Sequence, residues 1–366
     1  MSDGALQPAR GSARVAEYDL VRLVAIILVV LIHVIAPFAR PADAAASGPD
    51  AAYLASRAVR FAVPAFVMLT GVLVWTRPRG GGHDGWVGFF VRRLKTIVVP
   101  YLFWSAVFIV AGTVLVDRDP GSIRQVIRGL VLGTTWYHLY FVPVIVGVYA
   151  LAPVASAAYR RWSALPFVIS LPIGVYVPIL IAERGLSTSA PYALVSLVCA
   201  YLPYAAVGAW YARIRSGDRG RMVETRTWPI ALLGGLALRL WFTLSGEAAV
   251  TREAASALTL LMNMLASIGL VGLASVIVSR GRRVGEASVA LAPAVFGVYL
   301  MHPLVLLILE RAAVSLFGAL PGPGLWTLVV WPALTAACLV IAVWATRYPG
   351  LWWAHGASQP ASLRIG

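Results

Sequence analysis

The chain has 366 residues, of which 60% are hydrophobic and only 12% are charged. Soluble globular proteins carry about 25% charged residues, so this composition excludes an ordinary soluble enzyme and predicts an all-α protein with many membrane-spanning helices. The formal net charge of +15 does not indicate nucleic-acid binding, because the basic residues gather between apolar stretches, as they do in membrane proteins.

Ten apolar runs are long enough to cross a bilayer, and no linker divides them. We therefore predict one membrane domain over residues 15–350, with short cytoplasmic tails at 1–14 and 351–366. The predicted spans cover residues 18–38, 53–75, 96–116, 139–158, 163–182, 192–212, 228–245, 255–278, 289–309 and 325–346.

The first span carries two charges and a histidine. Asp19 and Arg22 are three residues apart and share a helix face. His33 follows Arg22 by eleven residues, about 16 Å along a helix axis. With Arg22 at the inner surface, His33 lies near the middle of the bilayer, where ionisable groups usually line a cavity or pathway. We predict that His33 is a general base; the alternative is a buried histidine bonded to a neighbouring helix.

The beginning of the chain also has features of a cleavable signal. Arg10 and Arg14 precede the apolar run, and ADAAAS follows at 42–47. We expect an uncleaved first helix, because the run contains three ionisable residues and is the first of a long series of similar spans.

The second span, 53–75, contains Pro64 followed by the small residues Thr70 and Gly71. Small residues let two membrane helices approach closely, so we expect a helix contact there.

Basic residues then precede the third span: Arg92 and Lys95 are three residues apart, with Arg93 beside them. They predict a cationic patch for phosphate groups, or simple anchoring at the inner surface.

The stretch TTWYHLYFVPV at 134–144 begins the fourth span on the outer side. Its aromatic residues suit an interfacial belt. The other interpretation is an acceptor mouth, in which Trp136, His138 and Tyr140 hold a sugar ring.

In the ninth span, His302 lies some 13 residues from the inner end, about 20 Å deep. His302 and His33 therefore reach similar depths, and one interpretation is that they share a cavity. The alternative is a histidine bonded to a carbonyl freed by Pro303.

Basic residues set the predicted orientation, since cytoplasmic loops are enriched in them. Five arginines lie between 213 and 226, whereas most loops on the opposite side have one; the loop at 117–137 is an exception. We expect both termini in the cytoplasm and a multi-pass protein of the bacterial inner (cytoplasmic) membrane.

Cys199 and Cys338 lie in apolar runs, which predicts that both thiols are buried. No cluster of cysteines and histidines predicts a metal site.

Five stretches that follow one another along the chain resemble the acyltransferase family 3 of integral membrane proteins. The resemblance implies ten core helices that move an acyl group, often acetyl, from a cytoplasmic donor to a carbohydrate or related acceptor. The fourth stretch looks most like the subgroup that O-acetylates surface glycans such as enterobacterial common antigen; related members acylate macrolides. The stretches are DLVRLVAIILVVLIH, VPAFVMLTGVLVW, FFVRRLKTIVVPY, WYHLYFVPVIVGVYALAP and FGVYLMHP.

The resemblance also implies roles for matching positions. Arg22 and His33 match the family's R-x10-H, with His33 the suspected base. Arg92 and Lys95 match its R-x-x-R, although lysine keeps the charge and loses the bidentate phosphate geometry.

We therefore predict an O-acyltransferase that modifies polysaccharides or related molecules and holds no permanently bound cofactor. Acyl-CoA, with acetyl-CoA preferred, would dock at Arg92, Arg93 and Lys95. Arg22 and Asp19 would orient groups at the inner mouth, and His302 would position the acceptor or stabilise the oxyanion.

The expected partners are the lipid bilayer, acyl-CoA, a carbohydrate, glycolipid or macrolide-like acceptor, and glycan-synthesis proteins. Two other functions stay open from the sequence. Proline-broken helices and buried histidines also suit a permease or flippase for a glycan or small molecule. A non-catalytic member of a polysaccharide synthase complex is the third.

Overall fold

The computed structural model describes residues 15–39, 50–77, 85–216, 218–246, 250–348 and 351–356. Within these residues the regular secondary structure is entirely helical, as predicted. The predicted tail at 1–14 and most of the tail at 351–366 lie outside the described residues. The α-helices are α1 (Ala16–Ile35), α2 (Ala51–Ala58), α3 (Ala62–Thr70), α4 (Gly85–Arg93), α5 (Val99–Val116), α6 (Ile123–Leu132), α7 (Phe141–Ala150), α8 (Ala152–Arg161), α9 (Leu165–Glu183), α10 (Ala190–Ile214), α11 (Asp218–Ser245), α12 (Arg252–Arg280), α13 (Arg282–Leu291), α14 (Val295–Phe317) and α15 (Pro323–Arg347).

The helices reproduce the predicted series of membrane spans. Nine helices of the described chain are long and apolar enough to cross a membrane, and α7 with α8, bent by 54°, makes a tenth. The third and ninth spans begin earlier than the sequence predicts, at Gly85 and Arg282. In both cases a short helix carrying arginines, α4 or α13, precedes the apolar helix and continues into it. The all-α polytopic bundle is thus confirmed.

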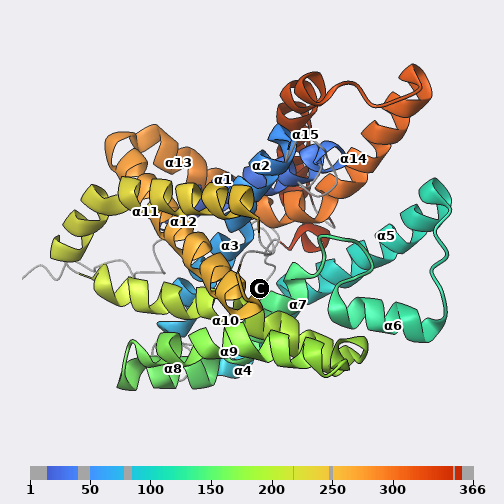
Figure 1. Ribbon diagram of the computed structural model, residues 1–366. Coiled ribbons are helices and arrows are strands. Elements are labelled where there is room, and N and C mark those ends of the chain that lie inside the picture. Colours follow the sequence, from blue (N-terminus) through green and yellow to red (C-terminus); the bar gives the residue numbers. More distant parts are fainter. Residues whose placement is uncertain are drawn as a thin grey trace, which may run out of the picture.

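Helix α1 lies in the middle of the bundle (Figure 1), where it contacts α3, α12, α13, α14 and α15. Its surroundings are apolar: Val21, Ile26, Val30 and Val34 are fully buried. A helix that is covered on several sides can present different residues to different cavities, and α1 does so along its length.

Helices α3 and α10 touch at the predicted small-residue contact. A Cβ built on Gly71 would lie 1.7 Å from the carbonyl oxygen of Ala205, and one built on Gly208 would lie 2.0 Å from that of Met68. Only glycine allows backbones to approach this closely. This contact fixes the span Ala51–Trp75 against α10.

A partly buried ion-pair network holds the first turn of α1. The guanidinium of Arg215 reaches Glu17 at 2.7 Å and Glu224 at 2.6 Å. It also donates to the hydroxyls of Tyr18 and Ser275, at 2.9 and 3.0 Å. Burial alone would lower the pKa of Arg215, but the two carboxylates outweigh it and raise that pKa. The network joins α1 to α11, α12 and the end of α10.

Candidate functional site

Three histidines from different parts of the chain meet beside the end of α1. The ring centroids of His33 and His302 are 5.3 Å apart, and those of His302 and His138 are 5.4 Å apart. The Tyr137 ring lies 4.7 Å from that of His33. Helix α1, helix α14 and the segment before α7 therefore build one cluster. Within the described residues, no group of three or more His, Cys, Asp or Glu is arranged to hold a metal ion.

The hydrogen bond of His302 decides which of its nitrogens is free. Its Nδ1 lies 3.0 Å from the carbonyl oxygen of Val298, one helical turn earlier. A carbonyl only accepts, so Nδ1 carries the proton, and in the neutral ring Nε2 is an acceptor. Nε2 is buried and has no hydrogen-bond partner among the described residues. The neutral ring can receive a hydrogen bond at this atom, but an oxyanion would require a donor there.

His33 and His138 line a cavity of about 610 Å³ that we call the Arg239 pocket. The walls also include Tyr140, Tyr201 and Asn263. Three arginines face the same space: Arg57 from α2, Arg60 just after α2, and Arg239 from α11. The amino end of α2 is capped by Asp50, whose Oδ1 accepts a hydrogen bond of 2.7 Å from the Tyr53 amide.

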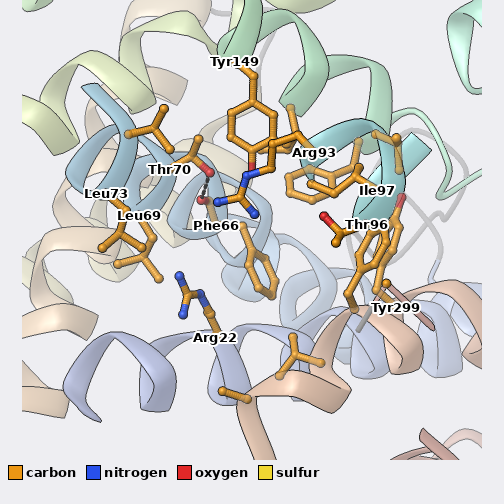
Figure 2. A pocket seen from close by; sticks show the side chains of 18 of the residues that line it. Arg22, Phe66, Leu69, Thr70, Leu73, Arg93, Thr96, Ile97, Tyr149 and Tyr299 are labelled. Atoms are coloured by element: carbon orange, nitrogen blue, oxygen red, sulfur yellow. Dashed lines mark hydrogen bonds between the residues drawn. The ribbon is translucent and has the colours of Figure 1, made fainter. Parts of the chain in front are cut away.

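A second cavity, of about 320 Å³, lies further along α1 toward its beginning; we call it the Arg93 pocket. Arg22 from α1 and Arg93 from α4 enter it from opposite sides (Figure 2). Thr70, Thr96 and Tyr149 add polar groups to a mostly apolar wall, although the Thr70 hydroxyl already donates to the Phe66 carbonyl. The cavity thus combines two cations with an apolar interior.

The two pockets share part of their walls. Val29, Val63, Phe141 and Tyr299 line both cavities, so one layer of side chains separates them. The Tyr299 hydroxyl donates a 2.6 Å hydrogen bond to the His138 carbonyl, which fixes its ring in this wall. Helix α1 runs past the wall, with Arg22 in one pocket and His33 in the other.

The model of an acyltransferase domain family, Acyl_transf_3, matches residues 15–347. The chain belongs to this acyltransferase family. It is therefore a multi-pass membrane protein of an acyltransferase family. Comparison with curated proteins and with solved structures finds no match.

In this acyltransferase, Asp19 and Arg22 pair with each other, as their spacing on α1 allows. Arg22 Nη1 lies 2.5 Å from Asp19 Oδ1. Asp19 is buried, and its Oδ2 has no hydrogen-bond partner. The pair leaves part of the Arg22 guanidinium directed into the Arg93 pocket, as Figure 2 shows.

The three predicted donor-binding cations of the acyltransferase separate in the structure. Arg93 lines the Arg93 pocket, whereas Arg92 and Lys95 are exposed and do not line it. Arg93 also lies over the rings of Tyr149 and Phe89, at 5.2 and 5.3 Å. Whether Arg92 and Lys95 bind the donor stays a prediction.

Arg77 is a basic neighbour that the sequence did not single out. Its guanidinium lies over the Phe89 ring at 4.8 Å, on which Arg93 also packs. Burial, together with Arg93 and Arg92, lowers the pKa of Arg77. Several positive charges therefore gather beside the Arg93 pocket.

The predicted acceptor residues also separate. His138 and Tyr140 line the Arg239 pocket, and the Tyr140 hydroxyl is 3.3 Å from that of Tyr201. Trp136 does not line the pocket; it is buried and stacks on Phe108 at 5.2 Å. Trp136 thus supports the segment that carries His138.

The arginines of the Arg239 pocket are the residues that sequence reasoning missed. Arg57 and Arg60 lie within the predicted span 53–75, and Arg239 lies within 228–245. An ionisable residue inside a membrane span is by default a candidate for function. That signal was present in the sequence and would have identified all three.

Proposed function

We propose that the protein is a membrane O-acyltransferase that moves an acyl group, preferably acetyl, from acyl-CoA to a hydroxyl of a carbohydrate or related acceptor. The supporting observation is the position of α1, which carries Arg22 in one pocket and His33 in the adjacent one. Arg22 and Arg93 suit the phosphates of CoA, because guanidinium groups bind phosphate through paired hydrogen bonds. The Arg239 pocket receives the acceptor.

The reaction follows from this arrangement. His33 takes the proton of the acceptor hydroxyl as that oxygen attacks the thioester carbonyl carbon. The new C–O bond forms, the C–S bond breaks, and the thiolate of CoA leaves and receives a proton. His302 is buried and lines neither pocket, and its ring lies 5.3 Å from that of His33 between centroids, so it supports the His33 ring and does not contact the acceptor. Only the acyl group needs to pass the wall between the pockets.

The test is transfer of label from radioactive acetyl-CoA to a panel of glycan and macrolide acceptors by purified protein. We expect His33→Ala to lower transfer by about 10²–10⁴-fold, the usual contribution of a general base, with unchanged insertion and elution. His83→Ala, a histidine between predicted spans, is the matched control. Normal transfer by His33→Ala would refute the base assignment, and acetyl-CoA neither bound nor hydrolysed would favour a permease.

A further inference from the structure

Arg239 is a buried cation with no counter-charge among the residues that the structure describes. The residue is 4% exposed. Its Nη2 donates a 2.8 Å hydrogen bond to Asn263 Oδ1, and Asn263 Nδ2 donates to the Tyr204 hydroxyl at 3.1 Å. These partners are neutral, and none of the ion pairs in the described part of the chain includes Arg239. Burying a charge is costly unless an opposite charge compensates it.

The neighbouring charges increase that cost. Arg57 and Arg60 line the same pocket, and like charges in a partly desolvated space repel one another. The described residues that line the Arg239 pocket include no aspartate and no glutamate. Helix α2, the turn that follows it and helix α11 thus bring three arginines to one cavity from separate parts of the sequence.

The shape and other lining groups of the pocket fit a polar molecule. At about 610 Å³, it lies within the usual range for small-molecule sites, roughly 300–1,000 Å³. Tyr140, Tyr201 and His33 line the same space. A molecule that brings negative charge to the arginines therefore also presents its other groups to His33.

We propose that the Arg239 pocket selects acceptors that carry an anionic group, a phosphate or a carboxylate, near the hydroxyl that receives the acyl group. Arg239, Arg60 and Arg57 hold the anion, since the guanidinium fork matches both of these groups. A neutral acceptor leaves the charge of Arg239 uncompensated and binds weakly. This proposal rests on the proposed function for the statement that the bound molecule is the acceptor; the anion site itself does not.

The test is binding of ³²P-labelled inorganic diphosphate to the full chain in phosphatidylcholine nanodiscs. Saturating CoA is present throughout to occupy the Arg93 pocket. We expect saturable binding that weakens by about 10–100-fold in Arg239→Gln, the loss of a charge-assisted hydrogen bond. Arg60→Gln, at an exposed residue that is less able to disturb folding, should weaken it by about 10-fold. Arg282→Gln, a change at an exposed arginine outside both pockets, is the matched control and should leave it within about twofold.

The remaining comparisons decide the class of anion and its source. Glucuronate competes if the site also takes carboxylates, whereas glucose should not compete. Anionic phosphatidylglycerol nanodiscs should leave diphosphate binding unchanged; loss of binding there identifies a lipid headgroup as the occupant and overturns the acceptor proposal. Equal binding by wild type and both arginine variants, with normal elution and unfolding temperature, overturns the anion site. Transfer measured with the His33 variant tests the proposed function separately.

Discussion

Two arginines of this acyltransferase, the partly buried Arg215 and the buried Arg239, have opposite surroundings. Arg215 contacts two carboxylates and two hydroxyls, and it joins α1 to three other helices. Arg239 contacts one amide and faces a cavity with two further arginines. The charge of Arg215 is compensated by carboxylates of the same chain, so Arg215 has a structural role. The charge of Arg239 is compensated only when something negative enters the pocket, which is typical of a binding residue.

The largest expected effect is at Arg215. Replacing it with methionine leaves the buried Glu224 and the partly buried Glu17 without their cation, and breaking a buried pair costs about 3–5 kcal/mol, which is the upper bound here. Thermal unfolding of the purified Arg215→Met variant should show this loss, with a lower yield of folded protein. A variant as stable as wild type would show that the network is not structural.

A smaller effect is expected at the Arg93 pocket. Arg93→Gln should raise the KM for acyl-CoA by about 10-fold, because it removes one charge-assisted hydrogen bond to phosphate. Arg92→Gln serves as the comparison, since Arg92 is its exposed neighbour and does not line the pocket. Steady-state kinetics decide between them, and an equal rise in both variants would mean that the donor binds along the surface.

The stability effect of Arg239→Met should be smaller still. Removing a buried cation that has no carboxylate partner relieves a desolvation cost, while Asn263 loses one hydrogen bond. We expect these to offset each other to within about 1 kcal/mol. If Arg239→Met lost as much free energy of unfolding as Arg215→Met in the same experiment, Arg239 would be a structural residue too. The two arginines would then not differ in role.

The smallest effect is expected for an ion pair at the surface. Arg282 and Glu286 are 2.8 Å apart but 92% and 61% exposed. Exposed pairs one helical turn apart contribute about 0.3–0.5 kcal/mol. The free energy of unfolding of Arg282→Gln should therefore equal that of wild type within error. This variant provides the baseline for the others.

Much of the fold could be predicted from hydropathy, because the length of an apolar run fixes a membrane helix. The depth of His33 and His302 also followed from counting residues along helices, and their rings do lie close together. The roles of both residues stay predictions. Arg57, Arg60 and Arg239 were not predicted as site residues, although all three lie inside predicted spans.

The direction in which each residue leaves its segment explains the other differences between the predicted and the observed site. Arg92 and Lys95 share a helix face, as their spacing predicts, but that face is exposed and only Arg93 reaches the pocket. The helix changes to a π-helical turn at Leu94–Val98, which no sequence pattern announced. Trp136 likewise faces Phe108 and not the cavity, because the segment before α7 is irregular and has no helical period to follow.

The wall between the two pockets has a consequence for the permeability of the membrane. A protein with a cavity on each side of one thin layer is at risk of conducting ions. Here Val29, Val63 and Phe141 contribute no charge, and the Tyr299 hydroxyl is held by the His138 carbonyl. Moving one elementary charge through a membrane potential of 100 mV releases about 2.3 kcal/mol, so a leak would drain energy continuously. Under the proposed function, an apolar partition would let an uncharged acyl group pass while keeping the membrane electrically insulated.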